Sequence, residues 1–154
     1  MTELEQYLTE WLTERGYELE VHECDDEFFY CEPLSFIAVA TTGKDIDAHF
    51  LRFVRELGCT LDFSNAFIPE FLHEVGHDNV NGDFDDDEWE EYREWEHTFV
   101  GRDMSTYEAQ LEYLNHPIER AATQWAVDYI NSHEEEIAAM ADRLGKIFNT
   151  RKED

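Results

Sequence analysis

The chain has 154 residues, of which 42% are hydrophobic and 14% aromatic. This composition is typical of a folded globular protein and excludes a disordered acidic tail. Its net charge is −27, from 38 acidic and 11 basic residues. Such a surface repels nucleic-acid phosphates and anionic membranes, so we expect neither partner, whereas a basic protein partner or substrate would suit it.

The length predicts a single domain over residues 1–150, followed by a short tail at 151–154. Met1 is followed at once by acidic residues, and no apolar run is long enough to span a membrane.

The chain has three cysteines, Cys24, Cys31 and Cys59. Their number is odd, and their spacing fits neither a metal site nor a set of disulfides. We therefore expect a cytoplasmic protein whose thiols pack or lie idle.

The first element is predicted to be a helix. Thr2 and Glu5 form a capping box, because the hydroxyl can cap the helix while the carboxylate reaches back. Apolar residues follow at helical spacing over residues 4–12, and Gly16 is a typical helix stop.

Three short strands are predicted next. Residues 17–21 alternate between apolar and polar, which indicates a half-buried strand. Asp25-Asp26 is a turn signal, so residues 28–31 are expected to return as the second strand of a hairpin. Pro33 interrupts that strand, and the apolar run 36–40 is the third. A small N-terminal sheet is therefore expected.

Two helices follow in the middle of the chain. The first has an apolar face over residues 46–57 and ends at Gly58. Residues 61–63 allow a short strand or an extended link. The second helix begins between Ser64 and Pro69, has an apolar stripe, and is expected to stop by about Asn81.

This second helix contains the motif H-E-x-x-H, as His73-Glu74-Val75-Gly76-His77. Residues four apart lie one turn above each other, so His73 and His77 can present two imidazole nitrogens to one metal ion. Glu74 can then hold a water molecule bound to that ion, which is the arrangement of zinc peptidases. The alternative is a solvated helix face that spells the motif by chance. The apolar stripe favours the zinc site, because buried polar groups need partners.

Residues 83–96 are strongly acidic, with aromatic residues every three or four positions. We interpret this stretch as an amphipathic helix with an acidic outer face, ended by Gly101. A calcium-binding loop is the alternative, but the oxygen ligands lack the EF-hand spacing.

The remaining residues predict three helices. Ser105 can cap the first, Asn115 the second, and acidic residues 134–136 open the last. On the middle helix, Glu119 lies on the same face as two alanines, at 122 and 126. Small residues beside a carboxylate let another helix approach closely, which suits a third zinc ligand.

We favour Glu119 as that ligand and consider Asp78, His97 and Glu108 as alternatives. Glu119 could otherwise be a carboxylate stabilised only by the helix dipole. Tyr113 or His116, just ahead of Glu119, could supply a further hydrogen-bond donor to the reacting carbonyl oxygen. Three ligands leave a fourth position for water, which is the mark of a catalytic zinc.

The H-E-V-G-H motif and a later helix with Pro117, Glu119, Ala122, Trp125 and Ala126 resemble small bacterial and phage metallopeptidase-like proteins related to the ImmA/IrrE group. The match covers roughly residues 60–132, and an acidic insert replaces the usual apolar continuation after His77. The resemblance implies a zincin-like α+β core that is mainly helical, with His73, His77 and Glu119 as zinc ligands and Glu74 as the base. It also implies a cytoplasmic protein, often encoded on mobile elements, that cleaves a specific regulator.

Two functions are compatible with these patterns. The first is a zinc metallopeptidase that hydrolyses a bond in a cytoplasmic protein. The second is an acidic interaction protein, for instance a DNA mimic or an inhibitor-like binding module on a degenerate peptidase fold.

Overall fold

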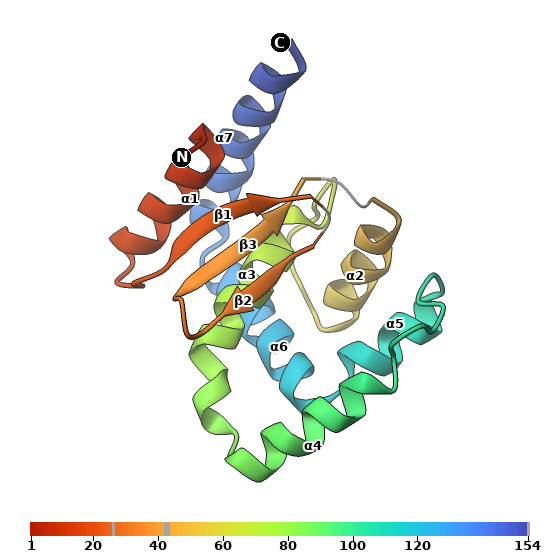
Figure 1. Cartoon of the computed structure of the whole chain (residues 1–154). Coiled ribbons are helices and arrows are strands. Elements are labelled where there is room, and N and C mark those ends of the chain that lie inside the picture. The colour runs from red at the N-terminus through yellow and green to blue at the C-terminus, as the bar shows by residue number, and fades with distance from the viewer. Residues whose placement is uncertain (26, 42–43, 154) are drawn as a thin grey trace.

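The computed structural model describes residues 1–25, 27–41 and 44–153, without the side chains of residues 44–47, 152 and 153 (Figure 1). The elements are, in order, α1 (Glu3–Glu14), β1 (Glu20–Cys24), β2 (Phe29–Cys31), β3 (Phe36–Ala40), α2 (Lys44–Glu56), α3 (Phe67–Val80), the 3-10 turn η1 (Asn81–Asp83), α4 (Asp86–His97), α5 (Tyr107–Leu114), α6 (Pro117–Ser132) and α7 (Glu134–Glu153). The predicted α+β class, mainly helical with a small N-terminal sheet, is confirmed. None of the described helices combines the length and the hydropathy needed to cross a membrane.

The sheet has the strand order β1-β3-β2, so β3 is central and β2 lies at an edge. β1 pairs with β3 in parallel and β2 pairs with β3 in antiparallel orientation. Residues 37–40 of β3 are all buried, as expected for a strand covered on both faces.

The predicted hairpin between residues 17–21 and 28–31 is wrong. β1 begins later, at Glu20, and pairs with β3 instead of β2. The hairpin joins β2 to β3, where Ser35 has a φ of 51° and its N–H donates to the Glu32 carbonyl at 3.1 Å. Pro33 lies within this turn, which suits its fixed φ and missing N–H. Asp26 of the proposed turn lies outside the described residues.

The two ends of the chain pack together beside the sheet. The capping box of α1 is confirmed, with the Glu5 N–H donating to Thr2 Oγ1 and the Thr2 N–H to Glu5 Oε1. α1 contacts β1 and α7 (Figure 1). α7 continues to Glu153, and Arg151, within the stretch predicted as a tail, binds Glu23 of β1 at 2.6 and 2.7 Å.

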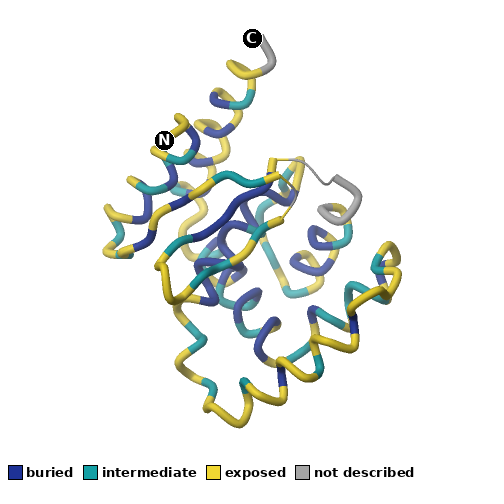
Figure 2. The backbone as a smooth tube through the Cα atoms, viewed as in Figure 1, coloured by how far each residue is buried: buried dark blue, intermediate teal, exposed yellow. Residues whose placement is uncertain are grey.

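Helices α3 and α6 form the buried centre of the molecule, as the dark blue segments of Figure 2 show. They approach so closely that a Cβ on Gly76 would lie 2.4 Å from the Ala122 carbonyl oxygen. α3 also contacts β2, β3 and α2. This pair of helices therefore fixes the position of the H-E-x-x-H motif relative to Glu119.

The other predicted helices are present, with small differences at their ends. α5 and α6 begin after Thr106 and His116, one residue later than the caps predicted at Ser105 and Asn115. Residues 61–63 form an extended link without strand pairing. The acidic stretch folds as the predicted amphipathic helix α4, in which only Tyr92 is buried.

Candidate metal centre

The motif residues lie on the buried part of α3. His73, Glu74 and His77 expose only 7%, 8% and 8% of their surface. The apolar residues around them, among them Phe71, Leu72 and Val75, are fully buried. The prediction of a buried helix is thus confirmed. The alternative, in which the motif lies on a solvent-exposed helix face, is excluded.

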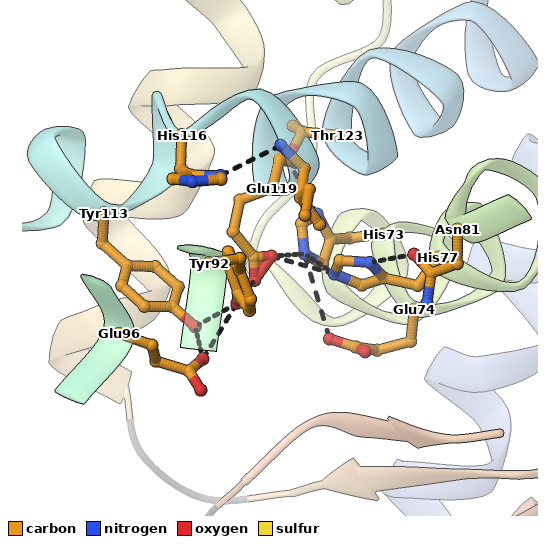
Figure 3. A network of polar contacts seen from close by, with 11 residues as sticks. His73, Glu74, His77, Asn81, Tyr92, Glu96, Tyr113, His116, Glu119 and Thr123 are labelled. Carbon is orange, nitrogen blue, oxygen red and sulfur yellow. Dashed lines mark hydrogen bonds and ion pairs between the residues drawn. The ribbon is translucent and has the colours of Figure 1, made fainter. Parts of the chain in front are cut away.

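Glu119 comes from the first turn of α6 and meets both imidazoles (Figure 3). Its Oε2 lies 2.9 Å from His77 Nε2 and 3.5 Å from His73 Nε2, and the two Nε2 atoms are 3.1 Å apart. Glu119 is 6% exposed. These residues form a group whose ligand atoms all lie within 4.8 Å of one another.

The spacing of these three atoms suits a zinc ion. Zinc bonds to histidine nitrogen and carboxylate oxygen are about 2.0–2.2 Å long, so two ligands of a tetrahedral site lie roughly 3.3 Å apart. The three observed distances of 2.9, 3.1 and 3.5 Å bracket that value. Two imidazoles and one carboxylate are also the donor set of catalytic rather than structural zinc sites.

Hydrogen bonds orient both rings so that Nε2 faces Glu119. His73 Nδ1 lies 2.7 Å from Thr123 Oγ1, whose hydroxyl donates to the Glu119 carbonyl oxygen at 3.1 Å and so accepts from the ring. His77 Nδ1 lies 3.1 Å from Asn81 Oδ1. With a proton on each Nδ1, two nitrogen lone pairs and a carboxylate oxygen converge on one point. A cation there would satisfy all three.

The charges of the group support one another. Burial raises the pKa of Glu119, but hydrogen bonds from His73 and His77 outweigh it and hold that pKa well below its usual range. Burial lowers the pKa of His77, but the hydrogen bond and charge of Glu119 dominate and raise it to about 9. A positive charge is therefore strongly favoured beside Glu119, whether a proton or a metal ion provides it.

Glu74 differs from Glu119 because its carboxylate accepts no hydrogen bond from the described residues. Its nearest ionisable neighbour is His73, with Oε1 4.0 Å from Nε2. Burial raises the pKa of Glu74, and the charges of His73 and His77 offset only part of this effect. A buried carboxyl group with a raised pKa and a free acceptor is suited to proton transfer near neutral pH.

Two tyrosines lie on the other side of Glu119. The Tyr92 hydroxyl lies 3.2 Å from Glu119 Oε1 and 3.0 Å from the Tyr113 hydroxyl (Figure 3). Both hydroxyls also lie within 2.9 Å of Glu96 Oε2. The Glu119 carboxylate is thereby held from both ends, with Oε1 facing α4 and Oε2 facing the imidazoles.

A cleft of about 260 Å³ opens beside the group. Its inner end includes Glu74, His77 and Glu119. One side is β2 with the residues before it, and the other side comes from α4 and Tyr113 of α5. The candidate metal centre is therefore buried but borders a space that a substrate could enter.

The alternative third ligands do not join the group. Asp78, His97 and Glu108 are exposed, and Asp78 instead accepts a hydrogen bond from Tyr30 at 2.7 Å. Tyr113 lines the cleft, and its hydroxyl donates to Glu96 Oε2 at 2.7 Å. His116 does not, because it caps α6 with its Nδ1 accepting from the Ile118 N–H.

The other metal-binding alternatives receive no support. Among the described residues, the acidic stretch 83–96 provides no set of three carboxylates close enough to hold an ion. The three cysteines are free and half-buried and do not join the histidines. This agrees with the interpretation of α4 as a solvated face.

Three residues that orient the ligands were not predicted from the sequence. Thr123 and Asn81 lie four positions after Glu119 and His77, on the same helix faces, so this spacing could have identified them. Tyr92 follows the motif on a different helix, and no local pattern connects it with Glu119.

Comparison of the chain with protein-family models, with curated proteins and with solved structures gives no match.

Proposed function

We propose that the protein is a zinc-dependent peptidase, with His73, His77 and Glu119 as metal ligands and Glu74 as general base. The observation that supports this most strongly is the convergence of three lone-pair donors at tetrahedral spacing next to a cleft. The free, buried carboxylate of Glu74 at the same place adds the one group that hydrolysis needs beyond the ligands.

The roles of the residues follow from their positions. Zinc, when bound, would lower the pKa of a water molecule and polarise the peptide carbonyl. Glu74 takes a proton from the attacking water and gives it to the leaving amine nitrogen, a transfer that its raised pKa favours. Thr123 and Asn81 hold the two rings in orientation, so that Nε2 stays directed at the metal.

A peptide substrate fits the surroundings of the site. β2 is an edge strand, and its residues 29 and 30 line the cleft beside Glu74 and His77. The edge of a sheet offers unpaired backbone groups to which an extended chain can add as a further strand. We therefore expect a peptide segment to lie along β2 with one carbonyl group near the metal.

Replacement of Glu74 by Gln tests this function. The variant should keep its zinc, because Glu74 is not a ligand, but lose at least about 100-fold in kcat/KM, since proton transfer is removed. Cleavage of a mixed peptide pool, followed by mass spectrometry, measures the activity, and elemental analysis measures the zinc. The proposal would be contradicted if the variant cleaved peptides as fast as the natural protein, or if the natural protein did not bind zinc.

The same proposal includes the protein family and the cellular compartment. The motif and the Glu119 helix resemble the ImmA/IrrE-related metallopeptidases, so a cytoplasmic regulator cleaved at one site is the substrate we expect. The free cysteines agree with a reducing compartment.

A second function, binding of a basic protein, is supported by the exposed acidic face of α4. Such binding should weaken in high salt and survive His73→Ala, because it does not need the metal. Binding that is insensitive to salt would exclude it.

A further inference from the structure

The cleft beside the candidate metal centre has an unusual lining. Six aromatic residues are among those that line it: Phe28, Phe29 and Tyr30 in and just before β2, and Trp89, Tyr92 and Tyr113 from α4 and α5. All of its charged side chains other than His77 are carboxylates, and no lysine or arginine is among the described residues that line it. This combination of rings and negative charge is how proteins hold organic cations.

The carboxylates lie at both ends of the cleft. Glu74 and Glu119 form the buried end, and Glu27 and Glu96 are exposed at its mouth. Glu96 Oε2 accepts a hydrogen bond from the Tyr113 hydroxyl at 2.7 Å and lies 2.9 Å from the Tyr92 hydroxyl. Glu27 has no side-chain partner among the described residues.

Two features of the cleft suit a bound substrate. Glu74 is more than nine-tenths buried and lines the cleft, yet accepts no hydrogen bond from the described residues. The half-exposed rings of Trp89 and Tyr30 can cover the apolar stem of a long side chain.

We propose that the cleft selects peptides with a lysine or arginine next to the bond that is cut. The apolar stem of that side chain lies between the rings of β2 and α4, and its charged end lies between Glu27 and Glu96. This inference rests on the proposed peptidase function and names its substrate class. Basic side chains suit the site because they gain both carboxylate contacts and the faces of Trp89 and Tyr92.

Peptide binding to the zinc-loaded Glu74→Gln protein tests the inference without turnover. Four pools of hexapeptides would differ only at the third position, fixed as lysine, arginine, norleucine or glutamate, with uncharged residues elsewhere. A neutral dye and fluorescence anisotropy report the affinity. We expect the lysine and arginine pools to bind at least 10-fold tighter than norleucine, and the glutamate pool to bind weakest.

Glu27→Gln, added to this protein, should reduce the preference for lysine over norleucine to within about threefold and leave norleucine binding unchanged. Glu96→Gln is the second variant. The matched control is Glu90→Gln with Glu94→Gln, since both residues are exposed on α4 outside the cleft lining and remove charge from the same helix.

Equal binding of lysine and norleucine pools would overturn the inference, as would an equal loss of preference in the Glu90 and Glu94 control. Failure of the peptidase proposal is visible separately, as absent zinc binding or absent cleavage by the natural protein. A protein that binds zinc and cleaves peptides without a preference for basic residues would contradict the inference alone.

Discussion

At the scale of single residues, the site depends on which atom each side chain presents. Thr123 and Asn81 fix the Nδ1 side of the two rings, and Tyr92 fixes one oxygen of Glu119. Among the described residues, the remaining atoms, two Nε2 and one Oε2, make hydrogen bonds only to one another. Outer hydrogen bonds of this kind commonly change metal affinity 10- to 100-fold.

Thr123→Val should therefore weaken zinc binding about 10-fold, because His73 loses the acceptor that holds its ring. Competition with a chromophoric chelator measures the affinity. Thr13→Val is the control, since Thr13 makes the same hydroxyl bond to its own helix, at 2.9 Å from the Thr9 carbonyl, outside the site. Equal zinc affinity in the Thr123 variant and the natural protein would contradict this role.

Much of the site could be predicted at this scale, because the signals are local. His73 and His77 share a helix face, and two alanines on the Glu119 face predicted the close approach of a second helix. The carboxylate of Glu119 does reach both rings. Tyr92 could not be predicted, because its contact with Glu119 depends on how α4 folds back across the chain.

At the scale of elements, the site is built on the contact between α3 and α6. Gly76 faces the backbone of Ala122, and a Cβ there would lie 2.4 Å from the carbonyl oxygen, well inside contact distance. The histidines and Glu119 project from these two helices near that contact. Any separation of the helices would therefore pull the ligands apart.

Gly76→Ala should lower the free energy of unfolding by about 1–3 kcal/mol, since backbone rather than a flexible side chain blocks the added methyl group. Urea denaturation of the metal-free protein measures it. Gly145→Ala is the matched control in α7, where a Cβ meets nothing within 4 Å, and it should raise stability by up to about 1 kcal/mol. Equal effects of the two substitutions would contradict the packing argument.

In the sheet, the strands could be predicted from the sequence but their pairing could not. The apolar run 36–40 correctly predicted a strand, and four consecutive buried residues make it the central one. Its partners could not be predicted, because a parallel pairing with β1 joins residues separated by a whole intervening strand. Sequence alternation indicates that a strand exists, and only tertiary packing decides its neighbours.

At the scale of the whole molecule, the two ends of the chain are tied together. Arg151, near the end of α7, binds both carboxylate oxygens of Glu23 in β1. The hydrogen bond from Arg151 holds the pKa of Glu23 below its usual value, and a hydrogen bond from the Thr2 backbone does the same for Glu5. Lowered pKa values mean that these carboxylates stabilise the fold when ionised.

This stabilisation should be fully present above the unfolded pKa of about 4.3 and be lost as pH falls through the lower pKa of the folded protein. Glu23→Gln should then cost about 1 kcal/mol of unfolding free energy at pH 7 and less at pH 3.5. Urea denaturation at both pH values measures the difference between the variant and the natural protein. A cost that is the same at both values would show that the charge of Glu23 has no part in it.

His73, His77 and Glu119 should together hold one zinc ion, which is measured most directly as the zinc content of the protein after equilibrium dialysis. The natural protein should retain one zinc per chain, and His77→Ala should retain almost none, because two ligands no longer close the site. A natural protein that leaves dialysis without zinc, or a His77→Ala variant that retains as much zinc as the natural protein, would contradict the account.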